Sequence, residues 1–297
     1  MHRTAFITIV GRPNVGKSTL MNHLLGEKVA IVSSKPQTTR NRIAGILTKG
    51  DDQYVFIDTP GVHHAKNKLG EFMMKSVRSS VGAADAIILI AEAGYPAGET
   101  EKNLIAQIKK TDLPSILVLN KIDLVNREKL AETIAGYAAL HNFDAVVPTC
   151  AETGKNVEEV LEEASNFLYE GEWMFDEDSL TDQPERQIAA EIIREKMLRT
   201  LSDEIPHGTA VVIEEFTEEE NLIRIRAEIF CEKQSHKGII VGKKGEMLKK
   251  IGTYAREDME AFFGQNVYLN LWVKVKEKWR DDMLSLNNFG FKPEDVR

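Results

Sequence analysis

The stretch Gly11-Arg12-Pro13-Asn14-Val15-Gly16-Lys17-Ser18 decides the fold of the N-terminal part of this chain. It has the spacing GxxxxGKS, and it follows an apolar run and opens a segment with a helical pattern. In that context the glycines let the backbone wrap around a polyphosphate, while amides at the helix N-terminus point at the anion. The stretch therefore predicts a phosphate-binding loop. Lys17 would reach the β- and γ-phosphates, and the Ser18 hydroxyl would bind Mg²⁺ beside Thr19.

Working outward from this loop, short β-rich runs alternate with longer helical patterns. The runs expected to form strands are Phe6–Val10, Tyr54–Ile57, Ala86–Ala91, Ile116–Leu119 and Ala145–Val147, and helices include Lys17–Leu25, Thr100–Lys110 and Val157–Leu168. Strands that alternate with helices form a mostly parallel sheet with both faces covered. We therefore predict a doubly wound α/β domain over residues 1–169.

Asn120-Lys121-Ile122-Asp123 indicates which base is bound, because it directly follows one of these strands on the ligand side of the sheet. A carboxylate at Asp123 can accept hydrogen bonds from guanine N1–H and N2–H₂, which adenine lacks. Such polar pairing discriminates by roughly 10⁴–10⁵. Lys121 can lay its stem along the base, and Asn120 can tie its loop to the phosphate loop. The predicted nucleotide is GTP or GDP.

Three further segments complete the expected nucleotide site. Asp58-Thr59-Pro60-Gly61 ends a strand, which places Asp58 to hold Mg²⁺ through water and the Gly61 amide to sense the γ-phosphate. Gln37-Thr38-Thr39-Arg40 follows Pro36, and one of its threonines would bind Mg²⁺ only in the triphosphate state. We favour Thr39 over Thr38. The third segment is Cys150-Ala151-Glu152, and the amide of Ala151 is a candidate contact to guanine O6.

These five motifs, in this order and spacing, resemble the translation-factor-like branch of regulatory GTPases, and within it the Era family. The motifs that carry the resemblance are GRPNVGKST, QTTR, DTPG, NKID and AETG. Cys150 stands where the family usually has serine. The resemblance implies that Lys17, Thr39, Gly61 and Asn14 act on the transferred phosphate.

The position of the nucleophilic water is the weakest part of this site. Val62 follows Gly61 where Ras-like proteins place a water-orienting glutamine. His63 and His64 come next and are candidates for a catalytic base, but residues of this kind more often belong to a solvated loop, which is the interpretation we favour. Slow intrinsic hydrolysis is therefore expected. Asn14 has two interpretations that stay open: it braces the loop, or, as in related GTPases, it helps to bind K⁺ near the phosphates.

The composition changes after residue 169, and we expect a linker over 170–184 and a second domain over 185–297. An amphipathic helix begins near Ile188, followed by strands Thr209–Phe216 and Leu222–Cys231, an apolar turn over 238–241, a helix Glu246–Phe263 and a strand Val267–Val275. Gly242-Lys243-Lys244-Gly245 lies between the turn and the helix. This α-β-β-α-α-β order with a GxxG loop resembles a type II KH domain, which clamps about four nucleotides of single-stranded RNA.

The charge around the GxxG loop supports that placement. Residues 233–256 hold seven Lys and Arg against one acid, whereas residues 214–220 hold five glutamates that would lie away from the RNA. The expected RNA contacts are Ile239, Ile240, Gly242, Lys243, Lys244, Gly245, Lys249 and Lys250. Trp272 and Trp279 are candidates for stacking on RNA bases. Their positions in a strand or helix favour a place in the core or at its flank instead.

The chain has 297 residues, a net charge of −8 and a pI near 5.5, so RNA binding must rest on local charge. Two cysteines form no disulfide framework, and no apolar run is long enough to span a membrane, so a cytoplasmic protein is expected. Because no heptad pattern or obvious exposed apolar stripe is present, a monomer is expected. The Era resemblance implies action in small-subunit assembly near the 16S rRNA 3′ end, and peripheral contact with the inner membrane. A tRNA-modifying GTPase, a small-molecule kinase and an RNA scaffold that binds GTP for stability are the alternatives.

Overall fold

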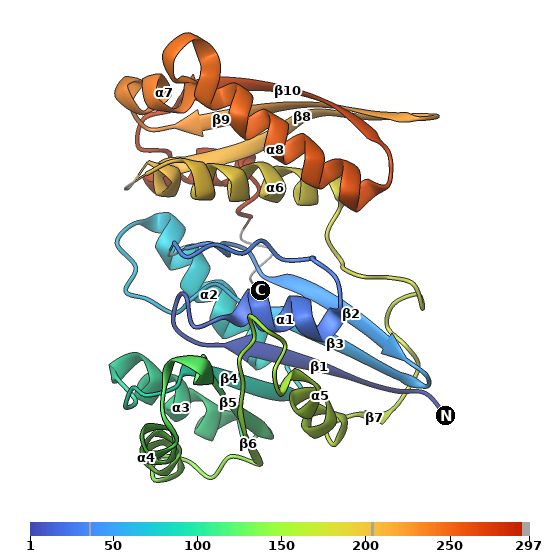
Figure 1. Ribbon diagram of the computed structural model, residues 1–297, viewed down its shortest axis with the longest axis vertical. Helices are drawn as coiled ribbons and strands as arrows, with labels where there is room; N and C mark the ends of the chain where they lie inside the picture. The colour runs from blue at the N-terminus through green and yellow to red at the C-terminus, as the bar shows by residue number, and fades with distance from the viewer. Residues whose placement is uncertain (36, 203–204, 293–297) are drawn as a thin grey trace. The chain divides into compact units, whose positions relative to one another are not determined.

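The computed structural model describes residues 1–35, 37–202 and 205–292, so Pro36 of the expected switch segment and residues 293–297 lie outside the description (Figure 1). The chain divides into two compact units: the first holds Met1–Ala65 and Gly70–Asp182, and the second holds Lys66–Leu69 and the described residues from Gln183 onward. No helix in the described ranges is long and apolar enough to cross a membrane.

The first unit is built on a seven-stranded sheet with the order β2-β3-β1-β4-β5-β6, and β7 pairs with β1. Its strands are β1 (Arg3–Val10), β2 (Ile43–Lys49), β3 (Asp52–Asp58), β4 (Ala86–Glu92), β5 (Ser115–Asn120), β6 (Ala145–Pro148) and β7 (Tyr169–Glu170). Only β2 and β7 pair in antiparallel fashion. Each of the five predicted strands is confirmed, since each lies within one of the parallel strands.

Helices cover both faces of this sheet, as Figure 1 shows. They are α1 (Lys17–Leu25), α2 (Lys68–Gly82), α3 (Glu99–Thr111), α4 (Arg127–Ala138) and α5 (Val157–Ser165), with a short 3₁₀ helix η1 (Ile122–Leu124). Leu20 of α1 and Val160 of α5 are buried in the core on one face, whereas Val77 of α2 and Leu104 of α3 are buried on the other. The predicted doubly wound α/β class is confirmed, although α5 ends three residues before the predicted Leu168.

Residues 170–182, most of the expected linker, are hydrogen-bonded to the first unit. Gln53 of β3 accepts at Oε1 from the amides of Met174 and Phe175, and its Nε2 donates to the carbonyl oxygen of Phe175. Thr181 forms a bridge with Gly45 of β2. This segment therefore runs along the β2–β3 end of the sheet before the chain enters the second unit.

The second unit has a three-stranded sheet with the order β10-β9-β8, in which β8 and β9 are antiparallel and β10 is parallel to β9. Its elements are α6 (Glu185–Thr200), η2 (Pro206–Gly208), β8 (Thr209–Glu219), β9 (Leu222–Cys231), α7 (Gln234–Val241), η3 (Lys243–Gly245), α8 (Glu246–Phe263), β10 (Asn266–Val275), η4 (Trp279–Asp281) and α9 (Met283–Asn288). One hydrophobic core joins α6, α7 and α8 to one face of the sheet.

Residues 238–241 and the two tryptophans of this unit bear on predictions made from the sequence. The apolar turn predicted over 238–241 is wrong, because these residues form the second half of α7, and Ile240 is fully buried in the core. Trp279 is fully buried and its indole N–H donates to the carbonyl oxygen of Gly208 at 3.0 Å, which confirms its interpretation as a core residue. Trp272 is 58% exposed on β10.

Candidate functional site

The phosphate-binding loop connects β1 to α1, and its glycines lie where no side chain would fit. Gly16 has φ of 106°, and a methyl group added there would lie 2.2 Å from Asn120 Nδ2. One added at Gly11 would lie 2.4 Å from the carbonyl oxygen of Ile90. The loop therefore fits closely between the ends of β4 and β5, with its backbone free to face a ligand.

Lys17 is the buried cation of this loop. Its Nζ donates to the carbonyl oxygens of Arg12 at 2.8 Å and Gly11 at 3.2 Å. Burial lowers the pKa of Lys17 to about 8, and the charge of Asp58 opposes that shift. An ammonium held only by neutral carbonyls is positioned to gain from an incoming phosphate anion.

Ser18, Thr39 and Asp58 converge on one point beside Lys17, although they come from α1, the following loop and the end of β3. The Ser18 hydroxyl donates to Asp58 Oδ2 at 2.5 Å, Thr39 donates to the same oxygen at 3.2 Å, and the two hydroxyl oxygens lie 3.1 Å apart. Asp58 Oδ1 is buried and has no hydrogen-bond partner within the described ranges. Mg²⁺ prefers hard oxygen ligands, and this cluster offers two hydroxyl oxygens and a carboxylate with one buried oxygen that has no partner among the described residues, so it is suited to Mg²⁺.

Burial of this cluster also raises the pKa of Asp58, against the opposing effects of Lys17 and the two hydroxyls. A divalent cation would remove that penalty by stabilising the carboxylate. The neighbouring Thr38 takes no part, because its hydroxyl donates to the carbonyl oxygen of Lys35 at 2.7 Å. Of the two threonines considered, Thr39 is thus the one that the fold brings to this cluster.

Asn120 joins the three loops around the base site. Its Nδ2 donates to the carbonyl oxygen of Val15 at 2.7 Å, and its Oδ1 accepts from the Ala151 amide at 2.8 Å and the Thr149 hydroxyl at 3.3 Å. The tie between Asn120 and the phosphate loop is present as expected. The expected contact of the Ala151 amide with guanine O6 stays a prediction, and in this structure that N–H donates to Asn120 Oδ1.

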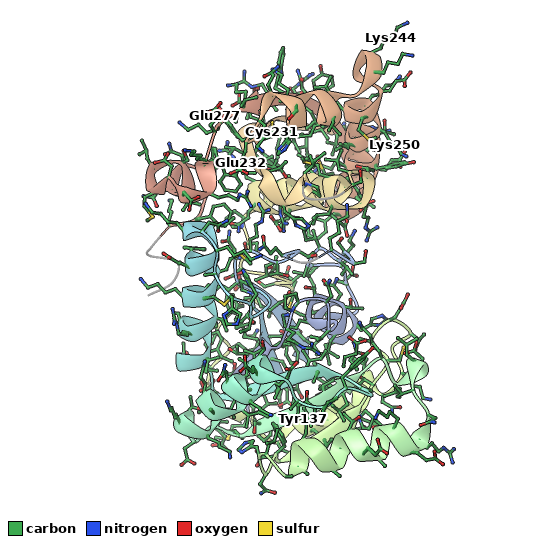
Figure 2. The ribbon with its side chains drawn as sticks, turned by 90° about the vertical axis from the view of Figure 1, so that its left-hand side faces the viewer. Tyr137, Cys231, Glu232, Lys244, Lys250 and Glu277 are labelled. Atoms are coloured by element: carbon green, nitrogen blue, oxygen red, sulfur yellow. The ribbon has the colours of Figure 1, made fainter. Side chains whose placement is uncertain are left out.

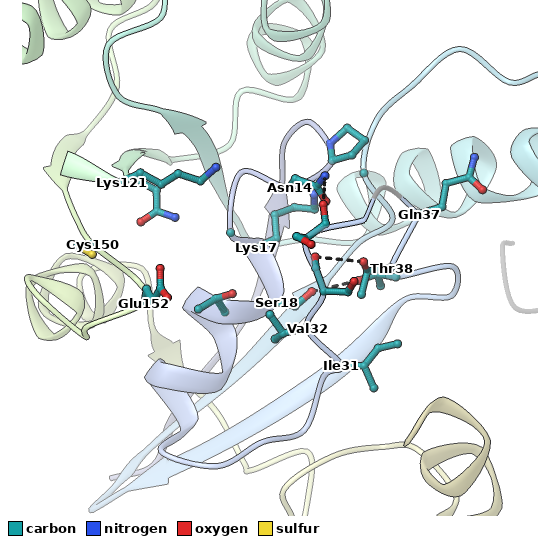
Figure 3. Close-up of a pocket in the computed structure, with 18 of the residues that line it drawn as sticks. Asn14, Lys17, Ser18, Ile31, Val32, Gln37, Thr38, Lys121, Cys150 and Glu152 are labelled. Carbon is teal, nitrogen blue, oxygen red and sulfur yellow. Dashed lines mark hydrogen bonds between the residues drawn. The ribbon is translucent and has the colours of Figure 1, made fainter. Parts of the chain in front are cut away.

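A pocket of about 640 Å³ opens over these groups (Figure 3). The predicted residues that line it are Pro13, Asn14, Gly16, Lys17, Ser18, Thr19, Thr39, Gly61, Asn120, Lys121, Asp123 and Cys150. Gly11, Arg12, Val15, Asp58, Thr59, Pro60 and Ala151 lie behind this lining. Thr59 is fully buried and donates to the carbonyl oxygen of Ile9, so its side chain is structural.

The segment after β3 is held against the phosphate loop. A methyl group added at Gly61 would lie 2.7 Å from Pro13 Cα, and the Val62 amide donates to the carbonyl oxygen of Gly11 at 3.1 Å. The Val62 side chain packs against the core under α2 and α3, and His63 Nδ1 is hydrogen-bonded to the carbonyl oxygen of Gly61. His64 is exposed. Hence neither histidine is arranged in this structure as a base for water.

In the second unit the GxxG loop joins α7 to α8. Gly242 has φ of 73° and Gly245 has φ of 82°, and a methyl group added at Gly242 would lie 2.7 Å from Met247 Cβ. Lys243 and Lys244 are exposed, and Figure 2 shows Lys244 pointing away from this unit. The loop thus presents two cations on a backbone that needs glycine.

A groove of about 450 Å³ runs from this loop between α8 and the free edge of β10. It is lined by Gly245, Leu248, Lys249, Gly252, Thr253, Arg256, Tyr268, Leu269, Asn270 and Leu271. Of the expected RNA contacts, Ile240 is wrong because it is fully buried in the core, and Ile239 is 48% exposed but does not line this groove. Lys250 points outward beside Tyr254, 5.8 Å from its ring centre.

The glutamate-rich end of β8 lies far from the GxxG loop within this unit. Asn266, just after α8 ends, pairs with Leu222, which follows the β8–β9 turn at Glu218–Glu220. The 18 residues of α8 span about 27 Å at the rise of an α-helix. The acidic turn and the basic loop are therefore at opposite ends of α8, as expected.

Comparisons with known proteins agree with this two-part organisation. A family described as "50S ribosome-binding GTPase" matches residues 6–121, and a family described as "KH domain" matches residues 204–280. GTPase Era of Ruminiclostridium cellulolyticum is 47% identical over 292 residues, which cover 98% of both chains, and that of Caldanaerobacter subterraneus is 49% identical with the same coverage. The chain belongs to the Era GTPase family.

Solved structures of Era agree over nearly the full length. One is Era in complex with MgGDPNP and nucleotides 1506–1542 of 16S ribosomal RNA, with 37% identity, a TM-score of 0.94 and coverage of 98% of this chain and 99% of the other. A variant of Aquifex aeolicus Era bound to GDP and AlF₄⁻ has 38% identity, a TM-score of 0.94 and coverage of 97% and 99%. Family membership identifies the chain as a GTPase with a KH domain.

Several residues of this Era-type site were not predicted from the sequence. Ile31, Val32, Ser33, Ser34 and Leu124 also line the nucleotide pocket, as do Gln37, Thr38 and Glu152 of the predicted segments, and most residues of the groove between α8 and β10 were not predicted. The loop before Thr39 has no periodic pattern that would place it. Its position depends on contacts such as that from Asn14 Nδ2 to the carbonyl oxygen of Ser34, at 2.8 Å.

Proposed function

We propose that this protein hydrolyses GTP as a switch that controls binding of the single-stranded 3′ end of 16S ribosomal RNA during small-subunit assembly. The observation that carries the proposal is the full-length similarity to Era bound to MgGDPNP and 16S rRNA nucleotides. The description of the G-domain family mentions the 50S subunit, but that family matches only residues 6–121. The RNA-binding unit is matched by Era, which favours the small subunit.

In this proposal each group around the nucleotide pocket has one task. Gly11, Pro13, Val15, Gly16 and Thr19 present the loop backbone to the phosphates. Lys17 would neutralise the β- and γ-phosphates, while Ser18, Thr39 and Asp58 would hold Mg²⁺, which would offset charge on the phosphates and on the GDP leaving group. Asp123 accepts the N1–H and N2–H₂ donors of guanine, and Lys121 is held for the base by its ion pair with Glu92, at 3.1 Å. Water attacks the γ-phosphorus, and GDP and phosphate leave.

Thr39 makes this site responsive to the nucleotide state. Its hydroxyl joins Ser18 and Asp58, yet it lies on a loop rather than on a strand or helix. A γ-phosphate with its Mg²⁺ would hold this loop, and hydrolysis would release it. Because position 62 holds a valine, partly buried against the core, instead of a water-orienting glutamine, intrinsic turnover is expected to be slow, on the order of a few 10⁻⁴ s⁻¹ as for an unassisted GTPase.

Asn14 is proposed to help bind K⁺ during hydrolysis. Its Nδ2 is committed to the carbonyl oxygen of Ser34, which leaves Oδ1 free to face the nucleotide pocket that Asn14 lines. Hydrolysis is expected to be faster in KCl than in matched NaCl for the natural protein, and equal in both salts for Asn14→Ala. Equal rates for the natural protein would restrict Asn14 to bracing the loop.

The proposed RNA target is tested by cross-linking in cells followed by sequencing of the bound RNA. A single peak near the 16S rRNA 3′ end is expected, and it should disappear when Lys243 and Lys244 are both changed to Asp. The matched control changes Lys109 and Lys110 of α3, two exposed neighbouring lysines in the first unit, in the same way. Signal spread over tRNA or mRNA would contradict the ribosomal assignment and leave the GTPase assignment intact.

Two further properties are proposed on narrower grounds. A monomer is proposed because the sequence has no heptad pattern, and sedimentation at micromolar concentration tests it. Peripheral contact with the inner membrane is proposed on family resemblance alone. Flotation with vesicles of anionic lipid tests that contact, and a protein that stays entirely in the soluble fraction would contradict it.

A further inference from the structure

The phosphate loop is attached to helix α3 through its second residue. Arg12 Nε contacts Glu101 Oε1 in an ion pair. Glu101 is only 1% exposed and lies in the first turn of α3, where its Oε2 accepts from the Gly98 amide at 3.1 Å. The same carboxylate contributes to the raised pKa of the buried Tyr137. A carboxylate buried this fully is costly unless it is paired.

Arg12 is also the residue whose backbone holds the key lysine. Lys17 Nζ donates to the Arg12 carbonyl oxygen at 2.8 Å, its shortest contact. The residues on either side are held by the segment after β3: Gly11 accepts from the Val62 amide, and Pro13 packs against Gly61. Among the described contacts, only Arg12 is held by α3, a helix that contributes no residue to the lining of the nucleotide pocket.

Capping the helix does not explain a charged group at position 101. A glutamine at the third position of a helix closes the same capping hydrogen bond. Arg12 is 40% exposed, so water can solvate its cation without a buried partner. The charge of Glu101 therefore serves to restrict Arg12 to one geometry, and with it the carbonyl oxygen that Lys17 uses.

We propose that Glu101 is a positioning residue for nucleotide binding, which acts through Arg12 to fix the phosphate loop so that Lys17 meets the β-phosphate. The inference rests on the proposed role of Lys17. Because Lys17 contacts the β-phosphate already in the ground state, the contribution falls on binding rather than on the chemical step.

The test measures the Kd for fluorescent GDP and kcat at saturating GTP for Glu101→Gln in the full chain, with binding sites counted by titration. The Kd is expected to rise about tenfold while kcat changes less than about twofold. The matched control is Glu99→Gln, an exposed acid in the same helical turn, which should leave both values unchanged. A similar rise in Glu99→Gln would overturn the inference in favour of a general charge effect.

A second variant separates positioning from folding. Arg12→Lys keeps a cation near the carboxylate but lacks the Nε donor, so it should raise the Kd for GDP as Glu101→Gln does. The variant that carries both substitutions should have a Kd no higher than that of the weaker-binding single variant. Additive losses would overturn the inference. So would a Kd that is unchanged in the folded fraction of either variant, since Glu101 would then only stabilise α3. Continued hydrolysis at saturating GTP leaves the proposed function standing in each case.

Discussion

The two glycines of the GxxG loop are predicted to differ sharply in how well they tolerate a methyl group. Gly242 has φ of 73° and ψ of 176°, a region open essentially to glycine alone, which costs other residues about 1–3 kcal/mol. The added methyl of Gly242→Ala would also lie 2.7 Å from Met247 Cβ and 2.9 Å from Met247 N. Overpacking of this kind costs about 1–3 kcal/mol. Gly242→Ala should therefore cost about 2–6 kcal/mol in total, unless a shift of the loop relieves part of that cost.

Gly245 provides the matched comparison. Its φ of 82° and ψ of 7° are left-handed helical, and an added methyl would meet no atom within 4 Å. The cost of Gly245→Ala is therefore the conformational cost alone, about 1–2 kcal/mol. Neither substitution changes the charge of the loop, so electrostatic attraction to RNA is the same in both variants.

The assay is urea unfolding of the full chain, followed by tryptophan fluorescence in a Trp173→Phe background. The remaining tryptophans, Trp272 and Trp279, both lie in the second unit. Gly242→Ala should unfold at distinctly lower urea than Gly245→Ala and should bind single-stranded RNA at least about tenfold more weakly, because displacement of the loop moves its phosphate contacts. Equal destabilisation and equal RNA affinity in the two variants would refute the argument.

Three other predictions concern the nucleotide site and the second core. Since the pKa of Lys17 is lowered to about 8, GDP binding above that pH requires uptake of a proton. The affinity for GDP should therefore be constant below pH 8 and fall about tenfold per pH unit above it. Equilibrium titration measures this, and an affinity that stays constant up to pH 9.5 would contradict the prediction. Asn120→Ala removes the hydrogen bonds that join three loops and should lower the free energy of unfolding by about 2–4 kcal/mol and weaken GDP binding, as measured by urea unfolding and titration. Trp279→Phe keeps an aromatic ring but leaves the Gly208 carbonyl unpaired, so it should destabilise the second unit by about 1–3 kcal/mol in the same unfolding assay with no change in GDP affinity.

The strands that were predicted correctly in the first unit are those whose apolar sequence reflects burial on both faces of the sheet. Ala86–Ala91 is continuously apolar because β4 is covered by helices on both faces, and the strand differs from the prediction by one residue. The strand β2 was missed. It contains Gly45, which weakens any strand pattern, and it is held by pairing with β3 and by a bridge to Thr181, far along the chain.

The helix α7 was missed for a similar reason. It has eight residues and contains Gly238, so its intrinsic tendency to form a helix is low. Burial of Ile240 against α8 and the sheet supplies the stabilisation that the local sequence lacks. The same burial removes Ile240 from any RNA contact, and a pattern of apolar letters alone cannot distinguish a groove lining from a core.

Within the nucleotide site, many residues that line the pocket could be predicted because the expected ligand dictates their chemistry. The residues that hold them could not, because the fold decides those contacts. Glu101 is one acid among many in a helical pattern, and nothing in its spacing connects it to Arg12. Likewise, the hydrogen bond from the Ala151 amide to Asn120 Oδ1 joins two segments that lie far apart in the sequence, and no motif indicates it.

Val62 shows how such a supporting contact bears on function. The sequence indicates only that no glutamine follows Gly61, whereas the structure shows the Val62 side chain partly buried against the core and its amide bonded to the Gly11 carbonyl oxygen. A glutamine placed at 62 would have to turn away from the core before it could orient water, and a backbone shift that allowed this would strain the amide contact with the phosphate loop. The proposed slow hydrolysis is thus consistent with the way this segment is anchored as well as with the missing side chain. Replacing Val62 by Gln should accordingly loosen nucleotide binding without restoring fast turnover, and stopped-flow dissociation of fluorescent GDP together with single-turnover hydrolysis measures both. Fast turnover with unchanged dissociation would show that the side chain alone limits the rate.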